Sequence, residues 1–139
     1  MRSFGAISIG ERRTADPQTV TEADIRSFAE QFDPQPMHLG SDPIASGWHT
    51  AALTMRGMVE CWLSEVAVDI GLGVDDLRWP TPVRPGDRLR TTVEVTDRES
   101  HDEDRGRVAV AVRTAVDDRS VLTMTGHVLV YRDRDTDES

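Results

Sequence analysis

The chain has 139 residues, a size typical of one domain that can bury a hydrophobic core. Its hydrophobic fraction of 37% and charged fraction of 29% are typical of a folded globular protein and not of a disordered one. The net charge of −9 argues against nucleic acid as a partner. All 16 basic residues are arginine, which excludes Schiff-base chemistry on a lysine side chain.

The two ends of the chain and its single cysteine bear on disulfides, on metal sites and on the location of the protein in the cell. Cys61 has no second cysteine with which to form an internal disulfide or a multi-cysteine zinc site. The first residues, MRSFGAISIGERR, contain no long apolar run, so we expect no signal peptide, no membrane partner and a cytoplasmic location. The last residues, RDRDTDES, predict a disordered tail at 133–139 after a single domain at 1–132.

The chain begins with a short strand expected in ERRTADPQTV, and the helix signals follow it. TEAD, at 21–24, is typical of a helix N-cap and predicts a short helix that ends before the prolines of FDPQPMH. Apolar residues then keep helical spacing from Trp48 to Ile70, which predicts one helix of about 22 residues. Gly71 and Gly73 would stop this helix, and Gly57 in its middle indicates close packing against a sheet.

Alternating segments follow the glycines. RLRTTVEVT, RVAVAVRTAV and SVLTMTGHVLVY each alternate apolar with polar or small residues, which predicts three strands, and GVDDLRW predicts a shorter one. VDDRS is typical of a hairpin turn between the last two strands. One long helix followed by antiparallel strands predicts an α+β domain whose sheet curls around the helix.

The segment FDPQPMH, at 32–38, places a carboxylate and an imidazole on either side of a stiff Pro-x-Pro unit. Proline disfavours a helical conformation in the residue before it, so Asp33 and Gln35 should be extended. One turn of helix therefore cannot bring Asp33 and His38 together. Taken singly, Asp33 also fits a turn residue before proline, and His38 also fits an ordinary hydrogen-bonded histidine.

Three segments together resemble the MaoC-like dehydratase or (R)-specific enoyl-CoA hydratase family, which has the hot-dog fold. FAEQFDPQPMHLG is similar to the family's Asp-x-(Asn/Gln)-Pro-x-His signature, and IASGWHTAALTMR is similar to its entry into the central helix. PVRPGDRLRTTVEV is similar to its Pro-Gly-Asp turn before the long strands. The chain departs from the family at two positions: Gln35 stands where Asn is more frequent, and Ser46 stands where many members have His.

The resemblance implies an enzyme of fatty acid metabolism that hydrates trans-2-enoyl-CoA or dehydrates (R)-3-hydroxyacyl-CoA. Asp33 and His38 would be catalytic and hold one water between them, with the Pro-x-Pro unit fixing their separation. The Gly47 N–H would bind the thioester oxygen at the start of the central helix.

The resemblance also implies roles for the residues around Gly47. Ser46, Trp48 and His49 would lie against the substrate, although Ser46 also fits a helix cap and His49 a plain first-turn residue. We expect no metal, because His38 and His49 have no third ligand clustered with them, and no cofactor beyond the coenzyme A of the substrate.

The implied assembly is a homodimer or higher homo-oligomer, because a lone hot-dog domain leaves a free sheet edge. Two alternatives stay open. One is an acyl-CoA thioesterase of the same fold. The other is a non-catalytic acyl-thioester-binding subunit of a hetero-oligomeric hydratase.

Overall fold

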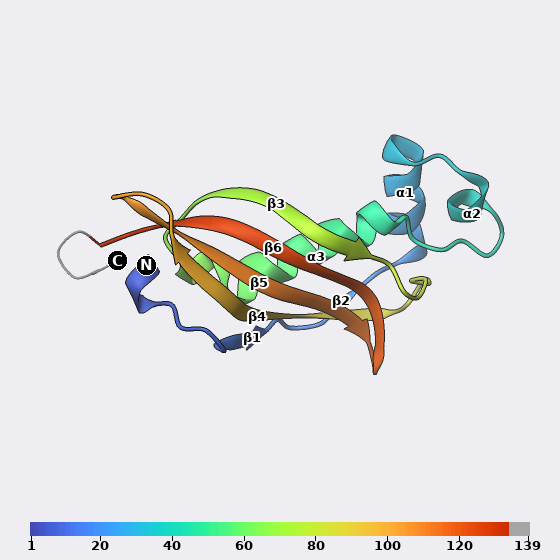
Figure 1. Ribbon diagram of the computed structural model, residues 1–139. Coiled ribbons are helices and arrows are strands. Elements are labelled where there is room, and N and C mark those ends of the chain that lie inside the picture. The colour runs from blue at the N-terminus through green and yellow to red at the C-terminus, as the bar shows by residue number, and fades with distance from the viewer. Residues whose placement is uncertain (134–139) are drawn as a thin grey trace.

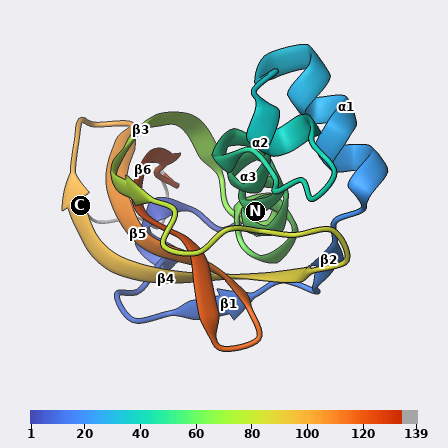
Figure 2. The same cartoon turned by 90° about the vertical axis from the view of Figure 1, so that its right-hand side faces the viewer.

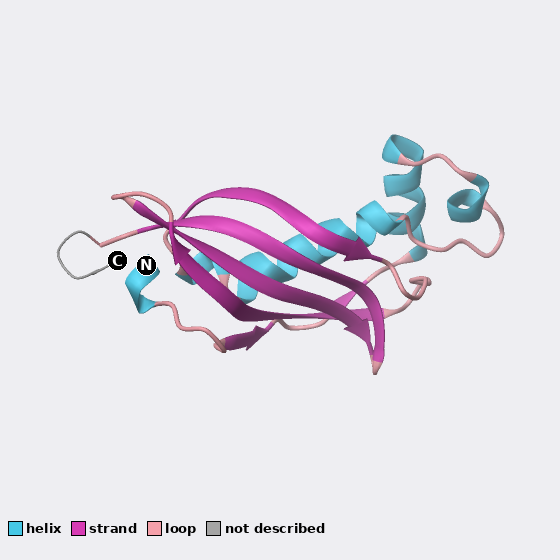
Figure 3. Cartoon of the chain, in the orientation of Figure 1, coloured by secondary structure: helices cyan, strands magenta, loops and turns pink. Residues whose placement is uncertain are grey.

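The computed structural model describes residues 1–133 as an antiparallel sheet wrapped around one helix (Figure 1, Figure 3). The helices are α1 (Glu22–Phe32), α2 (Pro36–Leu39) and α3 (Gly47–Cys61), with 3-10 turns η1 (Phe4–Ala6) and η2 (Leu63–Glu65). The strands are β1 (Arg12–Thr14), β2 (Gln18–Thr19), β3 (Val68–Arg78), β4 (Arg88–Ser100), β5 (Arg105–Val116) and β6 (Arg119–Tyr131). This arrangement confirms the predicted α+β class. Apart from Asp133, the tail expected at 133–139 lies outside the described residues.

The strands are ordered β1-β4-β5-β6-β3, and β2 also pairs with β4. Figure 2 shows the sheet curving around α3, while α1 and α2 lie together on the other side of the helix. Asp117 and Asp118 form the tight turn between β5 and β6, and Asp117 has a φ of 52°, which confirms the hairpin expected at VDDRS. Within residues 1–133, β3 pairs with β6 alone, so its other edge is free. No helix of this part of the chain is long and apolar enough to span a membrane.

Alternate side chains of the long strands point toward α3 and form the core. The larger cluster consists mostly of valines from β4, β5 and β6, and its members are Phe4, Ile7, Met58, Trp62, Val66, Val93, Val95, Val108, Val110, Val112, Val128 and Val130. Burial of each such side chain contributes roughly 1.5–3 kcal/mol. The predicted close packing of Gly57 against the sheet is confirmed, because a Cβ at this position would lie 2.8 Å from the Cβ of Thr91 on β4.

The central helix ends earlier than its apolar spacing predicts. α3 ends at Cys61, and β3 already begins at Val68, so Gly71 and Gly73 lie inside a strand and do not stop a helix. Ile70 pairs with β6. The prediction of one long helix was wrong because β-branched residues at positions that fit helical spacing also favour a strand, and pairing with β6 decides between the two.

Candidate active site

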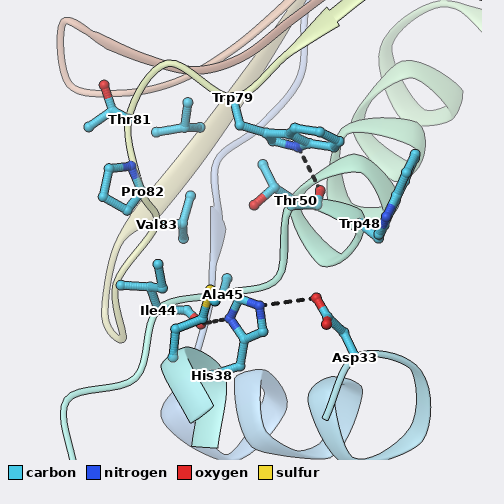
Figure 4. Close-up of a pocket in the computed structure, with 13 residues that line it drawn as sticks. Asp33, His38, Ile44, Ala45, Trp48, Thr50, Trp79, Thr81, Pro82 and Val83 are labelled. Carbon is cyan, nitrogen blue, oxygen red and sulfur yellow. Dashed lines mark hydrogen bonds and ion pairs between the residues drawn. The ribbon is translucent and has the colours of Figure 1, made fainter. Parts of the chain in front are cut away.

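The two prolines of FDPQPMH turn the chain from the end of one helix into the start of the next. Asp33 is the C-terminal cap of α1, with φ −152° and ψ 67°. Gln35 is extended, with φ −99° and ψ 151°, as the sequence predicts, and Pro36 is the first residue of α2. His38 is the third residue of α2, and its ring faces Asp33 (Figure 4).

Asp33 and His38 contact each other directly. His38 Nε2 lies 3.0 Å from Asp33 Oδ2, and both side chains are mostly buried. His38 Nδ1 lies 2.7 Å from the carbonyl oxygen of Ile44 and must donate to it, because a carbonyl oxygen only accepts. A neutral imidazole has only this one N–H, so Nε2 carries no proton of its own. A hydrogen bond between Nε2 and the carboxylate therefore needs a second proton on one of the two groups. The expectation that a water fits between the two groups was wrong, because the two side chains touch directly.

The carboxylate of Asp33 accepts a further hydrogen bond. Gln35 Nε2 donates to Asp33 Oδ1 over 2.6 Å, and the buried Ser46 also favours the charged form of the acid. Gln35 first, then Ser46, and then His38 hold the pKa of Asp33 below its ordinary value, because all three favour the charged form. Asp33 is therefore a carboxylate at neutral pH.

The start of α3 lies close to this pair. Ser46 caps the helix, because its Oγ accepts a hydrogen bond of 3.3 Å from the amide of Trp48. Gly47 is the first residue of α3, and N–H groups of a first helical turn have no partner inside the helix. This N–H is therefore available to an acceptor, in the part of a helix where the dipole favours negative charge.

A cavity of about 410 Å³ brings these groups together. Asp33, His38, Gly47, Trp48 and Thr50 are among the residues that line it. Figure 4 shows Asp33 and His38 on one side, Trp79 on the opposite side, and the apolar side chains of Ile44, Pro82 and Val83 to the left. The cavity thus has a polar end with an acid–imidazole pair and an apolar wall.

The structure separates His49 from the other residues proposed for the site. Asp33, His38, Gly47 and Trp48 line the cavity, and the buried Ser46 does not. His49 does not line it: its ring stacks on Phe28 of α1 with ring centroids 4.9 Å apart, and burial lowers its pKa. The His49 side chain points away from the cavity because successive side chains on a helix are turned by about 100° from one another.

Two site residues have no sequence signal that would have found them. Ile44 acts through its backbone carbonyl, which any residue would supply. Trp79 follows β3 and reaches the site only because the sheet curves around the helix, 32 residues away from Gly47. Across residues 1–133, no three His, Cys, Asp or Glu side chains are placed to hold a metal ion. The absence of a cofactor stays a prediction.

Comparison with known proteins places the chain in a family. The MaoC-like domain matches residues 5–117, so the chain belongs to that family and has the hot-dog fold. The structure of a MaoC-like dehydratase from Rhodospirillum rubrum is 34% identical, with a TM-score of 0.88 over 96% of this chain and 99% of that one. The uncharacterized protein YdeM of Bacillus subtilis is 29% identical over 77% of this chain and 82% of YdeM. An (R)-hydratase from A. caviae involved in PHA biosynthesis shares the fold at 24% identity, with a TM-score of 0.71 over 88% and 96% of the two chains.

These findings confirm the resemblance read from the three sequence segments. Membership of the MaoC-like family assigns the protein to the hydratases and dehydratases as a class.

Proposed function

We propose that the protein adds water to trans-2-enoyl-CoA thioesters, or in reverse dehydrates (R)-3-hydroxyacyl-CoA. The observation that carries this proposal is the 3.0 Å contact between Asp33 and His38 in the same cavity as the N–H of Gly47. The reaction needs a proton-transfer group beside a donor that stabilises negative charge on the thioester oxygen. The cavity contains both kinds of group.

The proposed reaction begins with a water beside the acid–imidazole pair. Each carboxylate oxygen of Asp33 keeps a lone pair after its contacts with His38 and Gln35, so the carboxylate accepts a proton from this water. The water oxygen then bonds to C3 of the substrate, and the electrons of the C2–C3 double bond move toward the thioester oxygen.

The charge that develops on that oxygen would be bound by the N–H of Gly47. Asp33 next gives its proton to C2, so one hydroxyl and one hydrogen are added and the enzyme returns to its starting state. His38, with Nδ1 bonded to the Ile44 carbonyl and Nε2 in contact with Asp33, would hold the carboxylate in place beside the water.

The substrate would supply the only coenzyme A that the reaction involves. Its acyl chain would lie against the apolar wall formed by Ile44, Val83 and Val121, which line the cavity. Pockets with an apolar body and a few placed polar groups are typical of small-molecule sites.

We also propose that two copies of the chain form a homodimer. A band of apolar side chains on α3, on β3 and just after β3 is exposed, with exposed fractions from 40% at Trp79 to 60% at Trp48. Its members are Trp48, Met55, Val59, Ile70, Leu72, Val74 and Trp79. The band runs along the free edge of β3, and such edges favour pairing with another strand.

The same band reaches the cavity. Trp48 and Trp79 contact each other edge to face with ring centroids 5.2 Å apart, and both line the cavity. A partner on this band would therefore lie beside the mouth of the site. The cytoplasmic location expected from the sequence stays a prediction.

The test is a spectroscopic assay with the purified protein and trans-2-enoyl-CoAs of several chain lengths. Hydration removes the absorbance of the conjugated thioester, while a thiol reagent in parallel reports free coenzyme A. Loss of absorbance without thiol release is the expected result. Thiol release would identify a thioesterase instead, and silence in both readouts would favour the non-catalytic subunit.

A further inference from the structure

We infer that the hydroxyl of Thr50 binds an uncharged oxygen on the acyl group of the substrate, so that the cavity selects enoyl thioesters whose acyl chain carries a hydroxyl or carbonyl group. This inference rests on the proposed function and names the class of acyl group that the site accepts. Thr50 contacts the substrate but takes no part in proton transfer, so its role is to determine specificity.

Thr50 is a buried residue whose side chain faces the cavity. It is the fourth residue of α3, is 2% exposed and lines the cavity. Figure 4 shows its hydroxyl directed toward the side of the cavity on which Val83 lies. Within residues 1–133, this hydroxyl has no hydrogen-bond partner, although the backbone N–H and carbonyl of Thr50 are both bonded. A buried hydroxyl without a partner destabilises the fold, so a partner inside the cavity would be favoured.

Thr54, one turn further along the helix, shows how a threonine hydroxyl is ordinarily satisfied in a helix. Thr54 Oγ1 donates to the carbonyl oxygen of Thr50, four residues earlier, over 2.9 Å. The carbonyl oxygen four residues before Thr50 belongs to Ser46, and it already accepts two backbone N–H groups over 3.0 Å and 3.1 Å, which use both of its lone pairs. The next carbonyl, of Gly47, accepts the indole N–H of Trp79. The hydroxyl of Thr50 is therefore left to the cavity.

The position of Thr50 on the helix indicates which part of the substrate it meets. Residues three apart on a helix share a face, about 5–6 Å from each other, so Thr50 follows the proposed oxyanion donor Gly47 along one side of the cavity. Trp48, at the mouth, is exposed, while Val83 and Val121 are buried. Coenzyme A must extend through the exposed mouth, so the acyl chain extends toward the buried end. The oxygen that meets Thr50 would therefore be carried by C4 or C5, the first carbons beyond the double bond.

The charges around the cavity restrict this oxygen to an uncharged group. Asp33 is a carboxylate, and His38, the cationic side chain nearest to it, is already in contact with that carboxylate. Among the described residues that line the cavity, none is an arginine, and the chain contains no lysine. A carboxylate on the acyl chain would therefore be buried near a like charge without a cation to balance it. A hydroxyl or carbonyl oxygen needs one hydrogen bond, which the Thr50 hydroxyl can make.

The first test compares the wild type with Thr50→Val, which removes the hydroxyl and keeps the shape of the side chain. The substrates are trans-2-hexenoyl-CoA and its 4-hydroxy and 5-hydroxy analogues. The wild type should hydrate at least one hydroxylated substrate with a kcat/KM about 5-fold to 100-fold above that of the plain one, the scale of one buried polar group left without a partner. Thr50→Val should lose or reverse this preference. Equal kcat/KM values of the wild type for all three substrates would overturn the inference, as would a preference that Thr50→Val retains.

The second test is urea unfolding, which needs no turnover. Thr50→Val should be at least as stable as the wild type, because it removes a hydroxyl that no protein group satisfies. Thr54→Val is the matched control: it removes the hydroxyl that contacts the Thr50 carbonyl and Thr114, so it should lose stability and keep the substrate preference. Equal losses of stability in the two variants would show that the Thr50 hydroxyl serves the fold, which would overturn the inference.

Failure of the proposed function can be told apart from failure of this inference. If the wild type hydrates none of the three thioesters, the proposed function fails. Calorimetric binding of saturated hexanoyl-CoA and its 4-hydroxy and 5-hydroxy analogues then decides the role of Thr50 without any reaction. Tighter binding of a hydroxylated analogue by the wild type, and not by Thr50→Val, would support the inference, and equal binding of all three would overturn it.

Discussion

The indole of Trp79 is hydrogen-bonded to the backbone of Gly47, at the first turn of the central helix. Its Nε1 donates to the Gly47 carbonyl oxygen over 2.8 Å, and a Cβ added at Gly47 would lie 2.6 Å from the ring. A glycine at this position is therefore required by the packing as well as by access to its N–H. The aromatic wall of the cavity and its proposed oxyanion donor depend on each other.

Gly47→Ala should consequently damage both stability and activity. The new methyl group must displace Trp79, and overpacking of this kind costs about 1–3 kcal/mol. Alanine keeps the backbone N–H, but moving Trp79 would misplace it, and we expect kcat/KM to fall by about 10²-fold, the scale for a misplaced group. Urea unfolding of Gly47→Ala, Trp79→Ala and the double variant tests the contact, because coupled residues give non-additive losses. Strictly additive losses would contradict a direct conflict between the two side chains.

Leu72→Lys should separate the proposed homodimer. Leu72 is exposed on β3, and two added lysines would face each other across the paired edges. Light scattering after size exclusion should give twice the chain mass of 15.5 kDa for the wild type and the single chain mass for the variant. Ala111→Lys, on the exposed side of β5, is the control that should stay dimeric. A wild type that elutes as a monomer would refute the assembly.

Gly57→Ala should destabilise the fold even though alanine is the better helix former. Alanine gains about 1 kcal/mol in helix propensity. Its methyl group, however, would lie 2.8 Å from the Cβ of the buried Thr91, and the strand would have to move. We expect a net loss of roughly 1–2 kcal/mol in the free energy of unfolding. Denaturant titration measures this loss, with Arg56→Ala, at an exposed neighbouring position, as the control. A gain in stability would show that β4 can move aside at little cost.

The pH dependence of stability should reveal the ion pair between Arg2 and Glu11. The two guanidinium nitrogens lie 2.8 Å and 2.7 Å from the carboxylate oxygens, and Arg2 lowers the pKa of Glu11 from 4.5 to about 2. Because the folded pKa lies below the unfolded one, the pair stabilises the fold above pH 4.5, and this stabilisation disappears as the pH falls toward 2.

Glu11→Gln should therefore be less stable than the wild type at neutral pH, and the difference should shrink between pH 4.5 and about 2. The midpoint of urea unfolding at a series of pH values measures this. A difference that stays constant over the whole range would show that the charge of Glu11 does not matter.

The sequence was sufficient for the parts of this site that depend on local chain geometry. Asp33 and His38 belong to one short segment with two prolines, and the resemblance to the family predicted that they act together, although not that they touch directly. The contact of Trp79 with Gly47 depends on the curvature of the whole sheet, and no local pattern carries it. The end of the central helix was missed because Ile70 satisfies the spacing of a helix and also the composition of a strand. His49 was assigned to the substrate because it lies in the first turn of the helix close to Gly47, but neighbouring residues on a helix point in different directions.

The most direct test of the proposed chemistry is the hydration rate of Asp33→Asn beside that of the wild type. The substitution keeps the shape of the side chain and one acceptor oxygen at the end of α1, so thermal unfolding should change little. We expect the wild type to remove the enoyl-thioester absorbance for at least one chain length. The variant should do so about 10²-fold to 10⁴-fold more slowly, the usual contribution of a general acid–base group. A variant that hydrates the same substrate at the wild-type rate would show that Asp33 does not transfer the proton.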